Sequence, residues 1–505
     1  MKKIYTLFTA AAALFAAVSC DLNLTPVGTL SYDPENTIVI QADIDGFEAG
    51  VIAQMRGLGY GVYNEASDIM LDYFNAVTDY GNNYGGIHRT DNEFSASDYD
   101  TRDNWRGPYM AIRHYNVAIQ GCMSVPAQFK AKADLTRGEA YFGRAYAYLH
   151  LVRLFGKAYG PTSSSDLGVP IVLVYDQNEK PARKTVAEVY AQIKSDLDSA
   201  AVLLAGVKGE VRASRPTIDA VNALYARYYI DTKDYTNAAA SAMKVINTGN
   251  YALAATAEEM VKEYVNDEGT EPILQFVGNL SEGGYMSATY YGNMANYTEE
   301  GYGFCYRPYF LPTETLVNSY DNSDLRLAQW FSKDDYNTYI EGGWYKGDFY
   351  VFKKYQGNPE LNSGSMPNTA QKRKPLLISE MYLIAAEAYL AAGNTSEATA
   401  ALNTIQNARH ANLTTATTEN IHKEWYRETV GEGLRMSCLK RWGEGYSSRP
   451  GQPGALSKGL LMTGEFYTEK SFPASDYHFL FPVPTHEMQV NPNLVQNEGY
   501  SAVSE

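Results

Sequence analysis

Tyrosine and asparagine crowd into one stretch of the chain, YMSATYYGNMANY, which runs from Tyr285 to Tyr297. The stretch holds four tyrosines and two asparagines, and neither a helical nor a strand period runs through it. A tyrosine ring is a flat apolar surface with a polar tip, and an asparagine amide both donates and accepts hydrogen bonds. Together they suit a ligand with apolar faces and a rim of hydroxyl groups, such as a sugar. The candidate ligand-binding residues here are Tyr285, Tyr290, Tyr291, Asn293 and Tyr297.

A second stretch, DYFNAVTDYGNNYGGIHR, has the same composition and supplies the candidates Tyr73, Asn82, Asn83 and Tyr84. Trp330 and Trp344 are further candidate rings in the long segment that follows the first stretch. The chain contains 42 tyrosines in 505 residues, so an alternative interpretation is that many of these rings simply pack between helices. A ligand-binding ring and a core ring differ in burial, which the sequence alone does not reveal.

Catalytic chemistry is poorly supported. The chain has no G-x-S-x-G elbow, no P-loop and no G-x-G-x-x-G stretch. The seven histidines are scattered without H-E-x-x-H or another paired spacing for zinc. Adjacent acids such as Glu299 and Glu300, or Asp334 and Asp335, are typical of solvated charge. We therefore expect no catalytic residues, no metal and no cofactor, although a pair of glycosidase carboxylates stays open as an alternative.

The first residues indicate export. Lys2 and Lys3 precede an apolar run from Leu7 to Val18, and small residues lead to Cys20. The run is shorter than the roughly 20 residues that a membrane-spanning helix needs. The junction AAVSC resembles a bacterial lipoprotein box, so residues 1–19 are interpreted as a signal peptide and Cys20 as the lipid attachment site. Acyl chains on Cys20 would hold the protein to a membrane.

The composition limits the kinds of partner that the chain can bind. Removing residues 1–19 takes away Lys2 and Lys3, which changes the formal net charge from −16 to −18. A chain this acidic is a poor nucleic-acid binder. Beyond Cys20 only Cys122, Cys305 and Cys438 remain, which excludes a fully paired disulfide framework. Stability must therefore come from packing.

Helical periods dominate the rest of the chain. Between Arg137 and Phe155, apolar residues recur at steps of three and four. Thr185 and Glu188 predict a capping box for a helix with one apolar face, formed by Val189, Ile193, Leu197, Ala200 and Leu204. Pro216 is expected in the first turn of the next helix.

One helical hairpin occurs twice. YIDTKDYTNAAASAMKVI from Tyr229 and YLAAGNTSEATAALNTI from Tyr389 align at an offset of 160, which matches Ala238 with Ala398. Each copy has a long helix, a short polar turn and an alanine-rich helix, like a tetratricopeptide hairpin. The spacing separates the copies by insertions instead of placing them in a simple tandem array. The segments without helical period are 73–94, 271–355 and 446–475, and we expect function there.

Several motifs, in order, resemble the SusD/RagB family, the surface lipoproteins of Bacteroidetes that partner TonB-dependent outer-membrane transporters. They are WRGPYMAIRHYNVAI from Trp105, RGEAYFGRAYAYLHLVRLFG from Arg137, GVPIVL from Gly168, TVAEVYAQIKSDLDSAAVLL, AALNTIQNARH, GEGLRMSCLKRWG and the terminal FLFPVPTHEMQVNPNLVQNEGY. The resemblance covers the chain from Cys20 to Tyr500. One departure is Cys438, where the family usually has an acidic residue, and this puts a local ion pair in doubt.

The resemblance implies a mainly α fold: a SusD-like helical scaffold with tetratricopeptide-like hairpins and long irregular loop insertions. It implies a single unit over 20–505, with an N-terminal SusD-like region at 20–230 and a C-terminal RagB/SusD region at 270–505. It also implies a non-catalytic protein, lipid-anchored at the outer membrane and facing outward, that delivers oligosaccharides to a SusC-like TonB-dependent transporter. A peptide ligand, as in RagB-like members, is the main alternative; a protein-binding scaffold with no small ligand is another.

Overall fold

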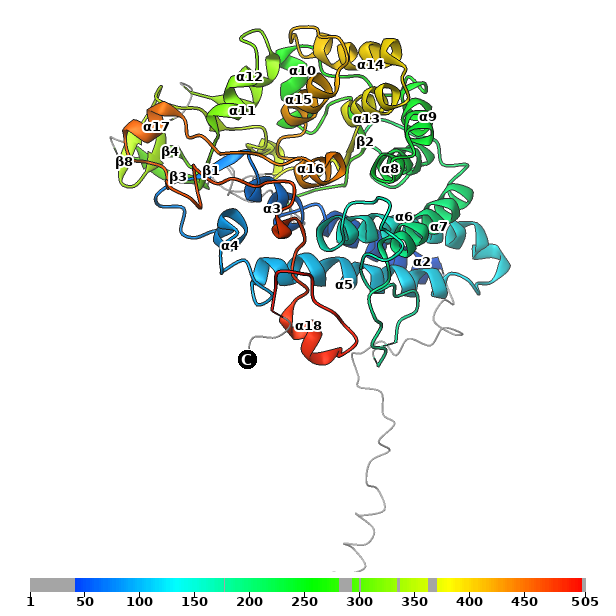
Figure 1. Ribbon diagram of the computed structural model, residues 1–505. Coiled ribbons are helices and arrows are strands. Elements are labelled where there is room, and N and C mark those ends of the chain that lie inside the picture. The colour runs from blue at the N-terminus through cyan, green and yellow to red at the C-terminus, as the bar shows by residue number, and fades with distance from the viewer. Residues whose placement is uncertain are drawn as a thin grey trace, which may run out of the picture.

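The computed structural model describes residues 41–176, 178–280, 293–298, 301–333, 337–361 and 370–501, with backbone only at 293–298 and 301–304. Long helices stack on one side of the molecule, and short strands, short helices and loops gather on the other (Figure 1). Each side has its own cluster of buried apolar residues. Within this described part, no helix combines the length and the apolar character needed to cross a membrane.

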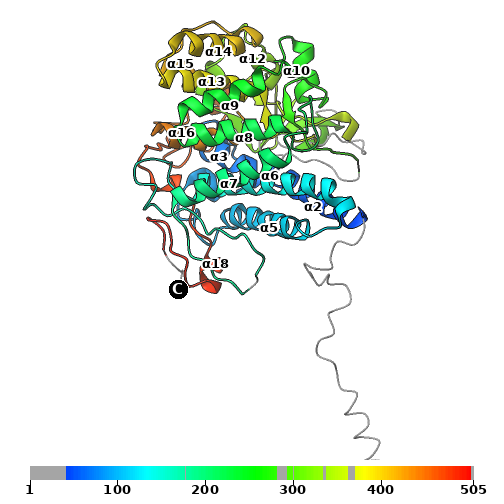
Figure 2. The same ribbon diagram turned by 90° about the vertical axis from the view of Figure 1, so that its right-hand side faces the viewer.

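The helical stack is a succession of antiparallel neighbours, seen in layers in Figure 2. Helix α5 packs on α6, α6 on α7, α8 on α9 and α9 on α13. The long helices are α2 (Gln41–Gly57), α5 (Tyr99–Gly121), α6 (Lys130–Phe155), α7 (Val186–Leu203), α8 (Ile218–Asp231), α9 (Tyr235–Ile246), α13 (Ile378–Ala391) and α14 (Thr395–Ala408). The mainly α fold is confirmed.

The repeated hairpin is present as α8–α9 and α13–α14. Ala238 and Ala398, the small residues matched by the offset, are both fully buried, which lets the paired helices approach closely. The two hairpins are distant in sequence, yet α9 packs directly against α13. The intervening insertion therefore leaves the stack and returns to it without interrupting it.

Local signals at helix starts are confirmed with one correction. Thr185 and Glu188 form the reciprocal capping box of α7. The prediction for Pro216 was wrong by a short distance, because α8 begins at Ile218 with Thr217 as its N-cap. Pro216 thus precedes the cap, where the fixed φ of proline suits extended backbone.

The other side of the molecule, which we call the loop lobe, comprises the described residues of 62–94, 254–361 and 446–475. Its strands form small sheets with the orders β1-β5, β10-β2, β3-β4-β7-β8 and β6-β9. They are β1 (Phe74–Ala76), β2 (Pro272–Leu274), β3 (Asn293–Thr298), β4 (Gly301–Arg307), β5 (Phe310–Pro312), β6 (Phe331–Ser332), β7 (Thr338–Ile340), β8 (Gly343–Tyr345), β9 (Val351–Phe352) and β10 (Leu376–Leu377), the last entering from the stack.

Short helices complete the chain. They are α3 (Val62–Met70), α4 (Gly85–Arg89), α10 (Ala257–Tyr264), α11 (Glu314–Asn318), α12 (Leu325–Trp330), α15 (Thr418–Glu428), α16 (Arg435–Trp442), α17 (Pro453–Ser457) and α18 (Thr485–Val490), with 3₁₀ turns at Ala127–Phe129, Pro359–Leu361 and Tyr477–Phe479. Segment 271–355 is therefore less irregular than its sequence suggests, because its strands and helices are too short to show a period.

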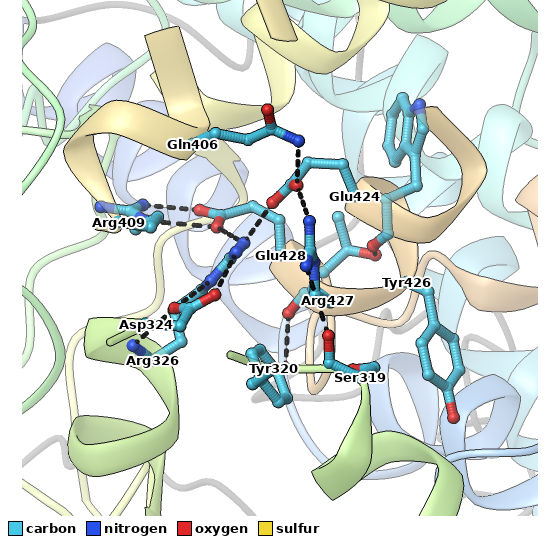
Figure 3. Close-up of polar contacts among 12 residues, drawn as sticks. Ser319, Tyr320, Asp324, Arg326, Gln406, Arg409, Glu424, Tyr426, Arg427 and Glu428 are labelled. Atoms are coloured by element: carbon cyan, nitrogen blue, oxygen red, sulfur yellow. Dashed lines mark hydrogen bonds and ion pairs between the residues drawn. The ribbon is translucent and has the colours of Figure 1, made fainter. Parts of the chain in front are cut away.

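A buried ion network joins the loop lobe to the stack (Figure 3). On α12, Arg326 holds Asp324 at 2.7 Å and, from one nitrogen, reaches Glu424 at 2.6 Å and Glu428 at 2.8 Å. Both glutamates lie on α15, which packs on α13 and so belongs to the stack. Arg409, which follows α14, holds Glu428 at 2.5 Å and Glu271 at 2.8 Å. These side chains are at most 2% exposed. Loop-lobe residues and helices of the stack thus share one set of paired charges.

The arginines keep Glu424 and Glu428 ionised. Burial opposes the charge of Glu428, yet the guanidinium groups of Arg409 and Arg326 lower its pKa to about 2. Burial also opposes the charge of Glu424, and there Arg326 and Arg427 outweigh it and lower the pKa. An acid buried without such partners would be strongly disfavoured in its charged form.

A local ion pair is present beside Cys438 although this residue is not acidic. Arg441, one turn later on α16, pairs with Glu387 of α13 at 2.8 Å, and Trp442 donates to the same carboxylate at 3.0 Å. The acid is supplied by another helix, so the local pair survives. Cys122 and Cys438 are buried free thiols, and Cys305 is buried as well.

Replacing Arg326 by Met should lower the free energy of unfolding by about 3–5 kcal/mol, because three buried carboxylates lose their shared partner. Urea denaturation followed by circular dichroism measures this. The matched control is Arg102→Met, which removes the exposed pair with Asp103, 42% and 35% exposed, and should change stability by no more than about 0.5 kcal/mol. Equal effects of the two substitutions would refute the structural role given to the network.

Candidate ligand-binding surface

The aperiodic segments meet in the loop lobe. Strand β1 of segment 73–94 pairs with β5 of segment 271–355, Phe74 opposite Pro312. The third segment, 446–475, joins them, because the Thr78 N–H donates to the Leu460 carbonyl at 2.9 Å and the Met462 N–H to the Ala76 carbonyl at 3.0 Å. Segments that the sequence separates by hundreds of residues therefore form one body.

Asp79 fixes the loop that follows β1 against the largest sheet. Its carboxylate lies 3.6 Å from the guanidinium of Arg307, the last residue of β4. The backbone N–H of Glu341, in the β7–β8 turn, donates to the same carboxylate at 3.2 Å. The tip of the β7–β8 hairpin therefore lies beside the loop that carries Asn82, Asn83 and Tyr84.

Tyr73 does not belong to this surface, and its prediction as a ligand-binding residue was wrong. Its side chain is fully buried, stacks on Tyr426 with ring centroids 4.8 Å apart, and donates to the Tyr426 carbonyl at 3.0 Å. Trp330 is also fully buried, with the Lys354 ammonium 4.0 Å from its ring centroid. Both rings are parts of the core, as the alternative interpretation of the tyrosine-rich composition anticipated.

Asn82, Asn83 and Tyr84 reach the surface. Asn82 is exposed, and the other two are half-buried. Asn82 and Tyr84 have φ values of 57° and 51°, in the left-handed region that residues with a side chain seldom adopt. Such backbone is concentrated at functional sites, where surrounding contacts hold it in place.

Arg89 and Tyr80 provide those contacts. Arg89 donates to the Asn82 side-chain oxygen at 2.7 Å and to the Tyr80 hydroxyl at 2.6 Å. The Asn83 amide donates to the Tyr80 carbonyl at 2.6 Å. The amide nitrogen of Asn82 lies 3.4 Å from exposed Glu93. The loop is thus pre-organised, with a polar edge of Asn82 at the surface.

The third segment contributes two rings that the sequence analysis missed. The Tyr467 hydroxyl lies 3.2 Å from the Tyr80 hydroxyl, and burial together with this contact raises the pKa of Tyr80. Neighbouring Phe466 is 43% exposed. Their segment had been singled out for its lack of period, but only the long-range contact of Tyr467 with Tyr80 places it at this surface.

Trp344 and Tyr339 form a cross-strand pair on the β7–β8 hairpin. The residues are directly opposite in the register, and their ring centroids are 5.2 Å apart at 61°. Both are half-buried, so the pair presents aromatic edges and faces at the surface. Tyr345 on the same hairpin has the Lys458 ammonium 5.9 Å from its ring.

The stretch that opened the sequence analysis is only partly described. Tyr285, Tyr290, Tyr291 and Cys20, the predicted lipid attachment site, lie outside the described residues. Asn293 and Tyr297 belong to β3, which pairs with β4 in antiparallel register, Asn293 opposite Arg307. The expectation of no strand was wrong for this end of the stretch, since it forms an edge of the β3-β4-β7-β8 sheet.

A hollow of about 440 Å³ lies elsewhere, between the end of α16 and residues 474–480. Its walls include Leu439, Lys440 and the 44%-exposed Tyr477. Burial lowers the pKa of Lys440 to about 7, and its ammonium donates to the carbonyls of Arg153 and Gly156. It is an alternative ligand site. In the described part of the chain, no group of His, Cys, Asp and Glu is arranged to hold a metal ion.

Comparison with known proteins agrees with this architecture. A family model described as "Starch-binding associating with outer membrane" matches residues 33–230, and the "SusD family" model matches residues 226–500. A curated relative, SusD-like protein P2 of Formosa agariphila, is 25% identical over 96% of this chain and 98% of its own length.

Solved structures share the fold. A putative sugar binding protein from Bacteroides vulgatus superposes with a TM-score of 0.72 at 25% identity, over 92% of this chain and all of that one. A laminarin binding SusD-like protein superposes with a TM-score of 0.67 at 19% identity, over 92% of this chain and all of that one. The "SusD family" model by itself spans more than half of the sequence. The chain therefore belongs to the SusD family.

Proposed function

We propose that this protein is a non-catalytic surface protein that binds oligosaccharides through the loop lobe. The observation that carries the proposal is the convergence of Trp344 and Tyr339 with the loop of Asn82, joined through Asp79. Flat rings can stack on the apolar faces of sugars, while the amide of Asn82 can pair with hydroxyl groups. A pre-organised surface of this kind needs little ordering when a ligand binds.

Relatives support a saccharide as the ligand class. One solved neighbour is a laminarin binding protein, another is a surface glycan-binding protein of Bacteroides fluxus, and the N-terminal family description names starch. Their sequence identity to this chain is low, so they show that the fold is shared but do not identify the sugar that this protein would bind. The alternative is a peptide ligand, as in RagB-like members. The Asn82 loop supplies an amide edge, which would serve either ligand, whereas the Trp344–Tyr339 pair favours the saccharide.

Cleavage of the ligand is a less favoured function. The relatives are described as binding proteins. Near the candidate surface, Asp79 is engaged by Arg307 and by the Glu341 N–H. These contacts give Asp79 a positioning role between the loop and the hairpin. New reducing ends after incubation with a bound glycan would nevertheless assign an enzyme.

The proposal extends to the membrane. Residues 1–19 act as the signal peptide, Cys20 carries the lipid, and the unit over 20–505 faces outward from the outer membrane. Its partner is a SusC-like TonB-dependent transporter, to which it delivers the bound oligosaccharide. The description of the N-terminal family model, which names association with the outer membrane, supports this location.

Trp344→Ala should weaken saccharide binding by about 1–2 kcal/mol, or roughly 5- to 30-fold, because a stacking face is lost. The melting temperature should change little, since the ring is only half-buried. Isothermal titration calorimetry with laminarin and starch oligosaccharides measures the affinity. Tyr175→Ala, which removes a 41%-exposed ring outside the loop lobe, is the matched control and should bind normally. Full affinity in the double variant Trp344→Ala with Asn82→Ala would disprove this site.

Cys20→Ala should release the protein from the membrane fraction without changing its fold, because the acyl chains provide the anchor. Fractionation in high salt tests this, since salt screens residual electrostatic adhesion. Circular dichroism of the released protein checks the fold. Continued sedimentation of the variant with washed membranes would contradict the lipid anchor.

A further inference from the structure

The hollow of about 440 Å³ beside Lys440 lies where four distant parts of the chain meet. Its walls come from the turn after α6, the end of α16, residues 474–480 and residues 498–499. Neither Asn82 nor Trp344, which belong to the candidate surface of the loop lobe, lines it. Cavities of this size commonly hold small ligands, by combining an apolar lining with a few convergent polar groups. The hollow therefore offers a second place for a ligand to bind.

The ring of Tyr477 forms part of the wall and is held in place although it is exposed. Its centroid lies 3.9 Å from that of His478, and the Tyr500 ring meets it edge to face at 5.2 Å. The chain passes it so closely that a Cβ atom on Gly499 would lie 2.3 Å from a ring carbon. Gly499 also has a φ of 92°, which favours glycine. The ring thus keeps its position while Tyr477 remains 44% exposed.

Other parts of the lining are apolar. Leu439 and Phe479 line the hollow, are 1% and 6% exposed, and belong to the apolar cluster of the stack. Because they are packed into the core, they form a rigid surface beside the Tyr477 ring. An aromatic face next to apolar side chains suits the apolar C–H face of a sugar ring.

Two carboxylates at the hollow each have one oxygen engaged by a histidine. Oδ1 of Asp476 accepts the His478 backbone N–H at 3.0 Å and lies 2.6 Å from His478 Nδ1. Oε1 of Glu444 lies 3.0 Å from His422 Nδ1. Among the described residues, none donates a hydrogen bond to the second oxygen of either carboxylate. The histidines therefore orient the acids and leave one oxygen of each to accept a ligand hydroxyl group.

Lys440 supplies a donor to the same space. Its ammonium donates to the Arg153 carbonyl at 2.6 Å and to the Gly156 carbonyl at 2.7 Å. An ammonium group has three N–H donors, so the protonated form keeps one for a ligand in the hollow that Lys440 lines. Ser475, an exposed residue of the lining, adds a hydroxyl group that both donates and accepts. Donors and acceptors are thus both present, as a ligand rich in hydroxyl groups requires.

The charges around the hollow favour a neutral ligand. Glu444, Asp476 and Glu498 all line it and would repel an acidic sugar such as a uronic acid. Lys157 and Lys440 line it as well and offset part of this negative charge, so no cation is needed for balance. A neutral saccharide pairs with the donors and the acceptors without introducing a charge of its own.

We propose that this hollow is a second saccharide site, which takes a short neutral sugar stacked on Tyr477 and hydrogen-bonded by the carboxylates and the lysine around it. The inference rests on the proposed function in saccharide binding and adds a site that does not depend on Trp344 or Asn82. A single ring faces the ligand here, in place of the ring pair of the loop lobe. We therefore expect the hollow to bind more weakly than the loop lobe.

Binding in the hollow is best measured after the loop-lobe surface has been removed. The full-length double variant Trp344→Ala with Asn82→Ala should still bind maltotriose or laminaritriose in saturation-transfer NMR titrations, with lower affinity than the unaltered protein. Adding Tyr477→Ala should weaken this residual binding about 2- to 10-fold, because the stacking face is lost. Tyr99→Ala, which removes a 56%-exposed ring at the start of α5, is the matched control and should leave it unchanged.

A second variant tests the hollow without altering the ring. Ser475→Trp places a bulky side chain at an exposed position of the lining, so residual binding should disappear while circular dichroism shows an unchanged fold. Trigalacturonate, an acidic trisaccharide, should not bind the double variant, because the carboxylates of the hollow repel it.

Residual binding that neither Tyr477→Ala nor Ser475→Trp reduces would overturn the second site, and equal binding of trigalacturonate would overturn its preference for neutral sugars. Failure of the double variant to bind either neutral trisaccharide would also overturn the second site. The proposed function is judged separately, by whether the unaltered protein binds the longer laminarin and starch oligosaccharides.

Discussion

The pairing of buried charges between α12, α14 and α15 is the constraint on which the rest of the structure depends. Arg326 and Arg409 have no contact with water, and each must satisfy its charge inside the protein. Because Arg326 comes from the loop lobe and Glu424 and Glu428 from the stack, the charges are satisfied only when the two are docked. A buried ion pair contributes little net stability compared with an apolar replacement, but breaking one is costly. The network therefore specifies how the lobe sits, and the apolar clusters supply most of the stability.

Docking in this way gives the lobe an ordered surface without long regular elements of its own. Its strands are short, and contacts such as those of Asp79 and Arg89 position the turns between them. The resulting surface presents rings and amides side by side, with the left-handed backbone at Asn82 and Tyr84 held by side chains from beneath. Ion pairs and backbone turns thus act on one body.

Local patterns in the sequence predicted the stack well. The capping box at Thr185, the repeated hairpins and the mainly α class follow from spacings of three and four residues, which are visible within one helix. Ordered family motifs identified the SusD resemblance. Burial of single rings was not predictable, because Tyr73 and Trp330 are covered by residues far along the chain, Tyr426 and Lys354 among them. The contributions of Phe466 and Tyr467 and the adjacency of α9 and α13 were missed for the same reason.

Hydrogen–deuterium exchange with and without a bound oligosaccharide is the most direct test of the claim that the loop lobe binds the ligand. Our account predicts slower exchange at residues 79–84 and 339–345, whose backbones lie together at the candidate surface. Helices of the stack, such as α7 and α9, should exchange at unchanged rates. Slower exchange confined to residues 439–444 and 474–480, around the hollow beside Lys440, would contradict the account and place the ligand in that hollow.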